Sequence, residues 1–291
     1  MSEQLNQQTV LKALQDKLSA NPLLWGMYYT PKHFTINSPY FHTEILKYCS
    51  KARFLAVASP RESSKSTLLS FLYAAFCIAN KKKRHMVITS NTYAKSAGAL
   101  ATIKDEFKNN QKLQQDFRVN FDKDSEGDTV FLHPDGFKTR VLCKGHEQIG
   151  SVRGEKFGPY RPDLIIGDDL EDDIMVRSKE RRENLKEDFD SALIPAGDKK
   201  LCQYIMIGTI LHDDSLMAKL VSKTEYVEYT KLFYRALIEQ DGQEMSLWTE
   251  KWTVADLHRI RADKPSVFAK EYQNDPVARS IRKFNKKYLI Y

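Results

Sequence analysis

The sequence predicts an α/β fold with a mainly parallel central sheet flanked by helices, plus a small lid or linker subdomain. Three observations predict it. The chain has 291 residues, 42% of them hydrophobic, which is enough to bury a sizeable core. Between Phe54 and Ile207, short apolar runs alternate with helical patterns, as in parallel sheets with crossover helices. After about Leu216 this alternation ends.

The elements expected in the first half of the chain follow from the spacing of apolar residues. After a polar N-terminus, helical spacing runs from Val10 to Leu18. The next elements are the strand Phe54–Ala58, the helix Lys65–Ala79, the strand Met86–Thr89 and a helix in which Ala97, Leu100, Ile103 and Phe107 recur three or four residues apart.

The second half of the chain contains two apolar runs, Leu164–Ile166 and Tyr204–Ile207, that are too short for helices and suit strands buried on both faces. Asp135-Gly136 favours a tight turn. The other expected elements are the hairpin strands Val130–Leu132 and Thr139–Cys143, a charged helix over Arg177–Leu193, a strand over Tyr226–Phe233, and helices over Val254–Ala262 and Ser266–Gln273.

These patterns divide the chain into three expected units. Residues 1–50 form an N-terminal segment packed on the core, residues 51–215 form the core, and residues 216–291 form the lid or linker subdomain.

Composition narrows the class of protein only broadly. The 45 Lys and Arg against 38 Asp and Glu give a net charge of +7, which is compatible with an acidic partner such as nucleic acid without deciding it. The 4 cysteines are far apart and show no zinc-like spacing, which favours a reducing, intracellular setting. No signal peptide opens the chain and no apolar run approaches the ~18 residues that span a bilayer, so we expect no membrane association.

The segment FLAVASPRESSKSTLLSFLYAAF, from Phe54 to Phe76, has the order strand, polar turn, helix that a phosphate-binding loop requires. In the pattern GxxxxGK[ST], the lysine and hydroxyl are present as Lys65 and Ser66, while serines replace both glycines. Serine at a position of positive φ costs about 1 kcal/mol, which charge-assisted hydrogen bonds to a ligand can offset. The predicted nucleotide-binding residues are Ser59, Pro60, Arg61, Glu62, Ser63, Ser64, Lys65, Ser66 and Thr67.

Within this loop, Lys65 is expected to contact the β- and γ-phosphates of ATP, and the Ser66 hydroxyl to bind Mg²⁺, with Thr67 as the fallback ligand. The alternative interpretation is a serine-capped amphipathic helix that begins with a solvated lysine.

A second segment, RPDLIIGDDLEDD, is an apolar strand that ends in paired aspartates. Asp168 is the expected Mg²⁺ residue, and Asp169 is expected to orient and activate the attacking water. Because glutamate is the commoner residue at that second position, Glu171 is the reserve base. The alternative is an acidic loop that caps the next helix.

A third segment, YIMIGTILHDDSL, places a buried strand directly before Gly208-Thr209. The Thr209 hydroxyl at such a strand end can respond to the γ-phosphate. The alternative is a strand end followed by a helix capped by Asp213 or Asp214.

With these three segments in order, the chain resembles the ATPase portion of tailed-bacteriophage large terminases, from about His42 to the end. The matching features are Pro60-Arg61 in the loop, RPDLII with its paired aspartates, Gly-Thr followed by His212-Asp213-Asp214, and the closing SLWTEKWTVADLHRIRADKPSVFAKEYQNDPVA. His42 also resembles a family histidine near the adenine, with a core histidine as the alternative.

The resemblance implies an ATP- and Mg²⁺-dependent motor that translocates double-stranded DNA into a procapsid. It implies a portal protein and a small terminase subunit as partners, and a homo-oligomeric ring when assembled, with a monomer as the alternative in isolation. It places the virus-encoded protein in the host cytoplasm and outside the virion. Such terminases usually continue into a nuclease domain, so we expect this chain to be the motor without its nuclease.

The resemblance also assigns two arginines. Arg61 would lie against the γ-phosphate, and Arg153 in GSVRGEKFG would reach into a neighbouring subunit as an arginine finger. The alternative for Arg153 is a loop arginine bound to a carboxylate.

Two rival functions remain open at this point. One is a metal-dependent nuclease that uses the acidic cluster Asp168, Asp169, Glu171 and Asp172, although two-metal sites usually gather ligands from several elements. The other is a non-hydrolysing DNA-binding scaffold. The basic run Lys81, Lys82, Lys83 and Arg84 would contact DNA phosphates, or else complement the end of a helix.

Overall fold

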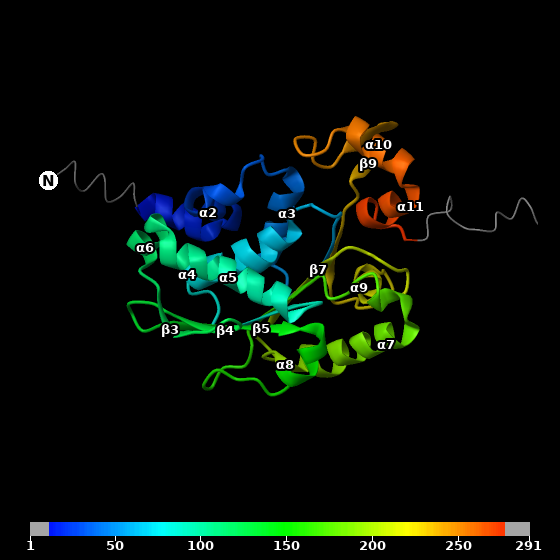
Figure 1. Ribbon diagram of the computed structural model, residues 1–291. Helices are drawn as coiled ribbons and strands as arrows, with labels where there is room; N and C mark the ends of the chain where they lie inside the picture. The colour runs from blue at the N-terminus through cyan, green and yellow to red at the C-terminus, as the bar shows by residue number, and fades with distance from the viewer. Residues whose placement is uncertain (1–11, 277–291) are drawn as a thin grey trace, which may run out of the picture.

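A central sheet of eight strands organises the molecule, and the computed structural model describes residues 12–276 of the chain (Figure 1). The order of the strands is β3-β4-β5-β2-β6-β7-β1-β8. The six neighbouring strands β5-β2-β6-β7-β1-β8 are parallel to one another. Strand β4 pairs antiparallel with both β3 and β5. The strands are β1 Phe54–Ala58, β2 His85–Ser90, β3 Asn120–Asp124, β4 Asp128–Leu132, β5 Lys138–Gly145, β6 Leu164–Asp168, β7 Gln203–Gly208 and β8 Thr230–Phe233.

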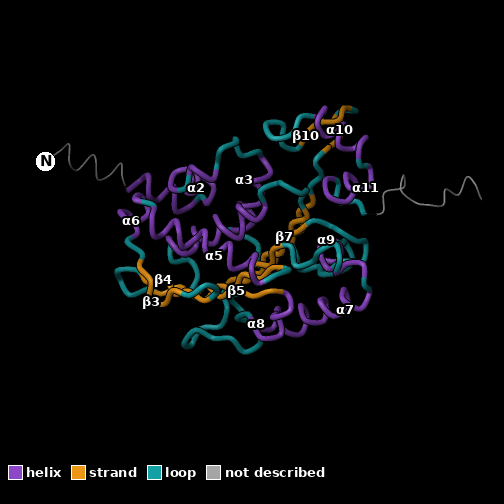
Figure 2. The backbone as a smooth tube through the Cα atoms, in the orientation of Figure 1, coloured by secondary structure: helices purple, strands orange, loops and turns teal. Residues whose placement is uncertain are grey.

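Helices cover both faces of the sheet (Figures 1 and 2). One face carries α2 Pro22–Tyr29, α3 Tyr40–Cys49, η2 Thr67–Tyr73 with its continuation α4 Ala74–Ala79, α5 Tyr93–Asn109 and α6 Gln111–Phe117. The other carries η3 His146–Val152, α7 Lys179–Asp188, η5 Phe189–Leu193, α8 Ile194–Ala196 and α9 Leu216–Val221. Short turns of helix occur at η1 Pro31–His33 and η4 Met175–Arg177.

The central strands are apolar along their whole length because successive side chains enter opposite cores. In β1, Leu55 and Val57 pack against the helices of the first face, whereas Ala56 and Ala58 pack against those of the second. This explains why the sequence of such strands reads as a continuous apolar run.

A smaller C-terminal subdomain stands beside the sheet. It contains the hairpin β9 Leu237–Gln240 and β10 Gln243–Ser246, whose turn residues Asp241 and Gly242 have φ of 53° and 76°. It has a separate core made of Ala236, Leu237, Leu257, Phe268 and Tyr272. Its helices are α10 Val254–Asp263, α11 Pro265–Val267 and η6 Phe268–Tyr272.

The expected mainly parallel α/β sheet with flanking helices is confirmed, and β1 occupies the expected residues. The charged helix begins at Lys179 rather than at Arg177, because the Ser178 side chain caps it by accepting a hydrogen bond from the Arg181 amide. Of the helix expected over Val10 to Leu18, the first two residues lie outside the described residues. The chain is helical over residues 12–20.

The expected boundary at residue 215 does not coincide with the edge of the sheet. Strand β8 pairs with β1 in parallel, with Val57 opposite Leu232 in the first core, and α9 contacts both strands from the opposite face, with Leu216 and Leu220 in the second core. The core therefore extends to β8, and only the part from about Ala236 has a core of its own.

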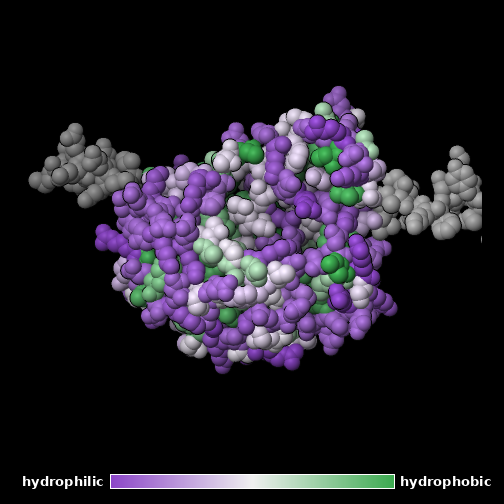
Figure 3. Space-filling model, in the orientation of Figure 1, coloured by the Kyte–Doolittle hydropathy of each residue, from purple (hydrophilic) through white to green (hydrophobic). Residues whose placement is uncertain are grey.

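The surface seen in Figure 3 is mostly hydrophilic, with hydrophobic residues in small separate patches. Within residues 12–276, no helix combines the length and the apolar character needed to cross a membrane.

Candidate active site

Three neighbouring parallel strands bring the predicted site residues to one edge of the sheet. Strands β6, β7 and β1 are adjacent and parallel, so their carboxyl ends lie side by side. Asp168 and Asp169 are at the end of β6, Thr209 follows β7, and the loop that begins at Ser59 follows β1. In open α/β sheets this edge is where ligands bind.

The loop after β1 keeps its shape without glycine. Glu62 and Ser64 both have φ of 60°, in the left-handed region, whereas Ser59 is not among the described residues with positive φ. The Ser59 amide donates to the Gly208 carbonyl at 3.0 Å, and its hydroxyl donates to the Ser63 hydroxyl at 2.5 Å. The expected penalty for replacing glycine thus applies at Ser64 and not at Ser59, and Glu62 adds a second strained position.

The tip of this loop is held by the C-terminal subdomain. The Arg61 amide donates to the Glu271 carbonyl at 2.7 Å, and the Lys251 ammonium donates to the Glu62 carbonyl. The Arg61 guanidinium is 4.0 Å from the Glu271 carboxylate and its side chain is 63% exposed. The Arg61 side chain is thus largely exposed and lies beside the C-terminal subdomain.

The Lys65 ammonium links all three strand ends. It donates to the Thr209 hydroxyl at 3.1 Å and lies 3.7 Å from the Asp169 carboxylate, and its side chain is buried. The Thr209 hydroxyl in turn donates to the Ser59 carbonyl at 3.1 Å. Lys65 follows the loop directly at the start of the helix, where backbone N–H groups have no partner within the helix.

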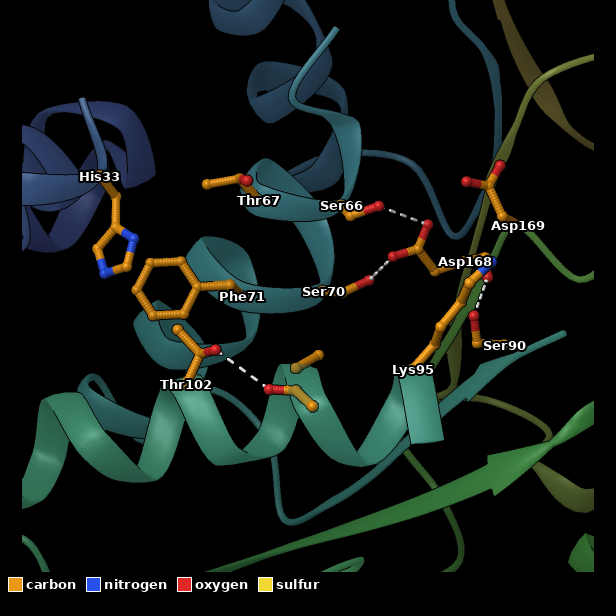
Figure 4. Close-up of a pocket in the computed structure, with 12 residues that line it drawn as sticks. His33, Ser66, Thr67, Ser70, Phe71, Ser90, Lys95, Thr102, Asp168 and Asp169 are labelled. Carbon is orange, nitrogen blue, oxygen red and sulfur yellow. Dashed lines mark hydrogen bonds between the residues drawn. The ribbon is translucent and has the colours of Figure 1, made fainter. Parts of the chain in front are cut away.

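Asp168 is buried and bound by hydroxyl groups of the facing helix (Figure 4). Ser66 donates to one carboxylate oxygen at 2.9 Å and Ser70 to the other at 2.7 Å. Burial and then the neighbouring Asp169 raise the pKa of Asp168 to about 6, and the two serine hydrogen bonds act against this shift. A hydroxyl and a carboxylate that already face each other are the oxygen ligands that Mg²⁺ accepts alongside water.

Ser70 was missed by sequence reasoning, although it had a signal. It lies four residues after Ser66 and thus on the same side of the helix, facing the end of β6.

A cavity of about 460 Å³ opens beside Asp168, between the helix η2 and the first turns of α5. Ser66, Thr67 and Asp169 line it together with Lys95, whose side chain points from α5 toward the end of β6 in Figure 4. Lys95 was not predicted, because its position depends on how α5 packs rather than on a motif. Its only sequence signal is that it falls in the first turn of the helix after β2.

Asp169 has a backbone conformation that few residues with side chains adopt. Its φ is 46° and its side chain is 35% exposed at the rim of the cavity. Its amide donates to the Ile207 carbonyl at 2.9 Å, which fixes the turn. Such strain of about 1–3 kcal/mol is found most often at functional sites.

Glu171, the reserve base, is directed away from the loop. Its two carboxylate oxygens accept the amides of Leu216 and Met217 at 2.8 and 3.0 Å, at the N-terminus of α9. Burial raises its pKa. The side chain is thus engaged as a helix cap and does not face the Lys65 ammonium.

The acidic residues after β6 do not gather into a nuclease-like cluster. Asp172 accepts the amides of Ile174 and Met175, while Glu171 caps α9. Across the described part of the chain, no group of three or more His, Cys, Asp or Glu side chains could hold a metal ion. Glu171 and Asp172, two of the four carboxylates in the nuclease alternative, are thus engaged with main-chain amides.

Two further sequence expectations are placed by the structure. Arg153 donates to the Ser191 carbonyl at 2.8 Å, on η5, and so binds a carbonyl rather than a carboxylate. Helix α9 is capped by Ser215, whose hydroxyl accepts the Ala218 amide, and not by Asp213 or Asp214.

No protein-family model matches the sequence, and no curated protein matches it either. Solved structures do match. The large terminase ATPase domain of Thermus phage P74-26 has a TM-score of 0.58 at 14% identity, over 81% of this chain and 92% of that chain. The large terminase of a thermophilic bacteriophage has a TM-score of 0.53 at 8% identity, over 82% of this chain and 53% of that chain. A structure of the latter terminase in complex with ATP-gamma-S has a TM-score of 0.50.

The structure has the mainly parallel α/β fold expected from the sequence, with a candidate site at the carboxyl ends of three neighbouring strands. The structural neighbours are, in particular, phage large terminase ATPase domains, and this chain spans about half the length of the thermophilic bacteriophage terminase.

Proposed function

We propose that this chain is the ATPase motor domain of a phage large terminase, which hydrolyses ATP to translocate double-stranded DNA into a procapsid. One observation carries the proposal: at the ends of three parallel strands, the Lys65 ammonium lies within 4 Å of both the Thr209 hydroxyl and the Asp169 carboxylate. Beside them, the Ser66 hydroxyl donates a hydrogen bond to Asp168. The terminase-like fold supports it.

The loop after β1 would bind the phosphates. Its backbone amides and the free N–H groups of the following helix turn favour an anion, and Lys65 would exchange Thr209 and Asp169 for phosphate oxygens. Because the ammonium is already desolvated, its attraction to an incoming phosphate is stronger than in water.

Ser66 and Asp168 would hold Mg²⁺. When bound, the ion neutralises charge on the phosphates during transfer. Ser70 keeps the Asp168 carboxylate oriented toward Ser66, because each serine binds a different oxygen of the same group.

Asp169, rather than Glu171, would orient the attacking water. It lies at the rim of the cavity, whereas both oxygens of Glu171 are occupied by α9. Thr209 would register the loss of the γ-phosphate, since its hydroxyl binds both Lys65 and the Ser59 carbonyl.

Arginines would complete the charge stabilisation. Arg61 is exposed beside the loop, where it would meet the γ-phosphate. Arg153 binds η5 in its own chain, so its proposed role as a finger requires a neighbouring copy in a ring. Duplex DNA, a portal protein and a small terminase subunit are the proposed partners, in the host cytoplasm.

The test is ATP hydrolysis with and without duplex DNA. Lys65→Ala should lower the rate about a hundredfold or more, because the phosphates lose a desolvated positive charge. The matched control is Lys104→Ala, which removes another poorly exposed ammonium, paired with Asp124 at 2.9 Å near the far edge of the sheet. Equal rates in wild type and Lys65→Ala would refute the site. In the same assay, Arg153→Ala should matter only at concentrations where copies associate.

ATP titration by calorimetry separates the remaining rival. A non-hydrolysing DNA-binding scaffold would release no heat with ATP and would not respond to Lys65→Ala.

A further inference from the structure

A second cavity lies at the opposite edge of the sheet, where the parallel strands begin. Its volume is about 470 Å³, and it is bounded by the end of α3, the end of α4 and the turn before β7. Five cationic side chains and no carboxylate line it: Lys51, Arg53, Lys82, Lys83 and Lys200. We call these five residues the basic edge.

The protein offsets the positive charge of the basic edge only in part, through the nearby carboxylates of Asp163, which interacts with Lys83, and Asp198, which interacts with Arg53. Within residues 12–276, none of the five makes an ion pair with a carboxylate. Arg53 donates to the carbonyls of Cys202 and Lys199, and Lys83 donates to the Asp163 carbonyl. Lysines elsewhere on the surface, such as Lys104, Lys108 and Lys138, are paired with aspartates.

Helix dipoles account for only a small part of this charge. Helices α3 and α4 end at Cys49 and Ala79, next to the cavity, and each C-terminus carries about half a negative charge. Two such ends offset about one of the five positive charges. With the carboxylates of Asp163 and Asp198 also counted, a surplus of about two positive charges remains on one concave surface, which favours an external anion.

The helix ends also decide which kind of polyanion fits. Free nucleotides bind where helix N-termini point, and here C-termini point toward the cavity, so an anion deep inside it would be repelled. Lys51, Lys82 and Lys200 are exposed and flexible, and their ammonium groups can meet phosphates at the cavity mouth. Lysine contacts of this kind bind a phosphate backbone without reading sequence.

We propose that the basic edge binds the phosphodiester backbone of duplex DNA, on the side of the sheet opposite the ATP site. The choice of duplex DNA rests on the proposed motor function, whereas the charge imbalance stands without it. A backbone grip that ignores sequence is what a motor moving along a whole genome requires.

The test is the salt dependence of duplex binding by the full chain, measured by fluorescence anisotropy with a DNA of roughly 30 base pairs and arbitrary sequence. The triple variant Lys51→Gln, Lys82→Gln, Lys200→Gln removes three exposed charges that have no side-chain partner. Each lost phosphate contact lowers the slope of log affinity against log salt by about 0.9, so the triple variant should lose about 3 units of slope and bind roughly tenfold or more weakly.

The matched control removes the same charge from exposed lysines elsewhere: Lys179→Gln, Lys223→Gln, Lys264→Gln. It should keep the wild-type slope. Single variants of the basic edge should each lose about one unit, which guards against misfolding of the triple variant. Equal losses in the control and the triple variant, or no DNA binding by wild type, would overturn the proposal.

ATP hydrolysis without DNA should be unchanged in the triple variant, since Lys65 is at the other edge of the sheet. If the wild-type chain does not hydrolyse ATP, the proposed ATPase function is wrong. That result would leave the DNA measurement intact, so the two proposals fail separately.

Discussion

His42 is the residue that connects helix α3 to the loop after β1. The ring is buried, and its Nε2 donates to the Ser63 carbonyl at 2.9 Å, while no partner for Nδ1 is present among the described residues. Burial lowers the pKa of His42 to about 4. The folded protein therefore holds a neutral ring with its proton on Nε2, and not a charge that would repel Lys251.

This histidine should make the protein less stable in mild acid. Because the unfolded chain takes up the proton near pH 6.5 and the folded ring only near pH 4, the stability present above pH 6.5 is lost as the pH falls through this window. In His42→Gln, whose amide can still donate to Ser63, urea unfolding between pH 7 and pH 4 should depend less on pH, by up to about 3 kcal/mol. His258→Gln, at an exposed histidine, is the control. Identical pH profiles for wild type and His42→Gln would contradict the assignment.

Single residues of the candidate site could be predicted when a motif fixed both their type and their strand end. Lys65, Ser66, Asp168 and Thr209 meet because parallel neighbouring strands must end together. The orientation of Glu171 could not be predicted, because the positive φ of Asp169 reverses the direction of the chain just before it. Lys95 depends on long-range packing that no local pattern encodes.

At the scale of elements, the strand–loop–helix unit around Lys65 contains a strained backbone position in its loop. Ser64 has φ of 60°, which glycine adopts freely, whereas Ser59 is fully buried and donates to Ser63. The two serines that stand in place of glycines therefore have opposite structural roles.

The strain predicts opposite effects of two glycine substitutions. Ser64→Gly should raise the free energy of unfolding by up to about 1 kcal/mol, because glycine removes the penalty of positive φ. Ser59→Gly should lower it by about 1–2 kcal/mol, because a buried hydrogen bond and backbone restriction are lost. Chemical denaturation of both variants checks this, and a loss of stability in Ser64→Gly would show that the loop is not strained there.

Elements with strong periodicity were the ones that the sequence could predict. Helix α5 shows its buried face at Leu100, Ile103 and Phe107, and β1 is a clear apolar run. The hairpin β9–β10 was missed because its strands have four residues each and are largely exposed, so they carry little alternation.

For the whole molecule, the pairing of β8 with β1 decides where the core of the central sheet ends. Strand β8 pairs with the outer edge of β1, the strand that precedes the loop beginning at Ser59. Its residue Leu232 belongs to the first hydrophobic core. The sequence predicted a boundary at residue 215 because the alternation of apolar runs and helical patterns ends there, but hydrogen bonding across the sheet continues beyond it to β8.

The pairing predicts the outcome of two truncations. A chain ending at residue 215 should not unfold cooperatively, because it exposes the backbone edge of β1 and removes α9 from the second core. A chain ending at residue 234 keeps β8 and should retain a cooperative thermal transition, although a weaker one. Circular dichroism melts compare them; equal cooperativity in both would mean that β8 is dispensable.

The C-terminal subdomain contacts the backbone of the loops after β1 and β7 at three points: Glu271 at Arg61, Lys251 at Glu62, and Asn274 at the Ile210 amide, at 2.8 Å. Because these hydrogen bonds are made to backbone atoms of the loops, they hold the main chain of the loops directly. If either loop moves, the C-terminal subdomain must move with it or these hydrogen bonds must break. The position of the loop after β1 is thus coupled to the position of the C-terminal subdomain.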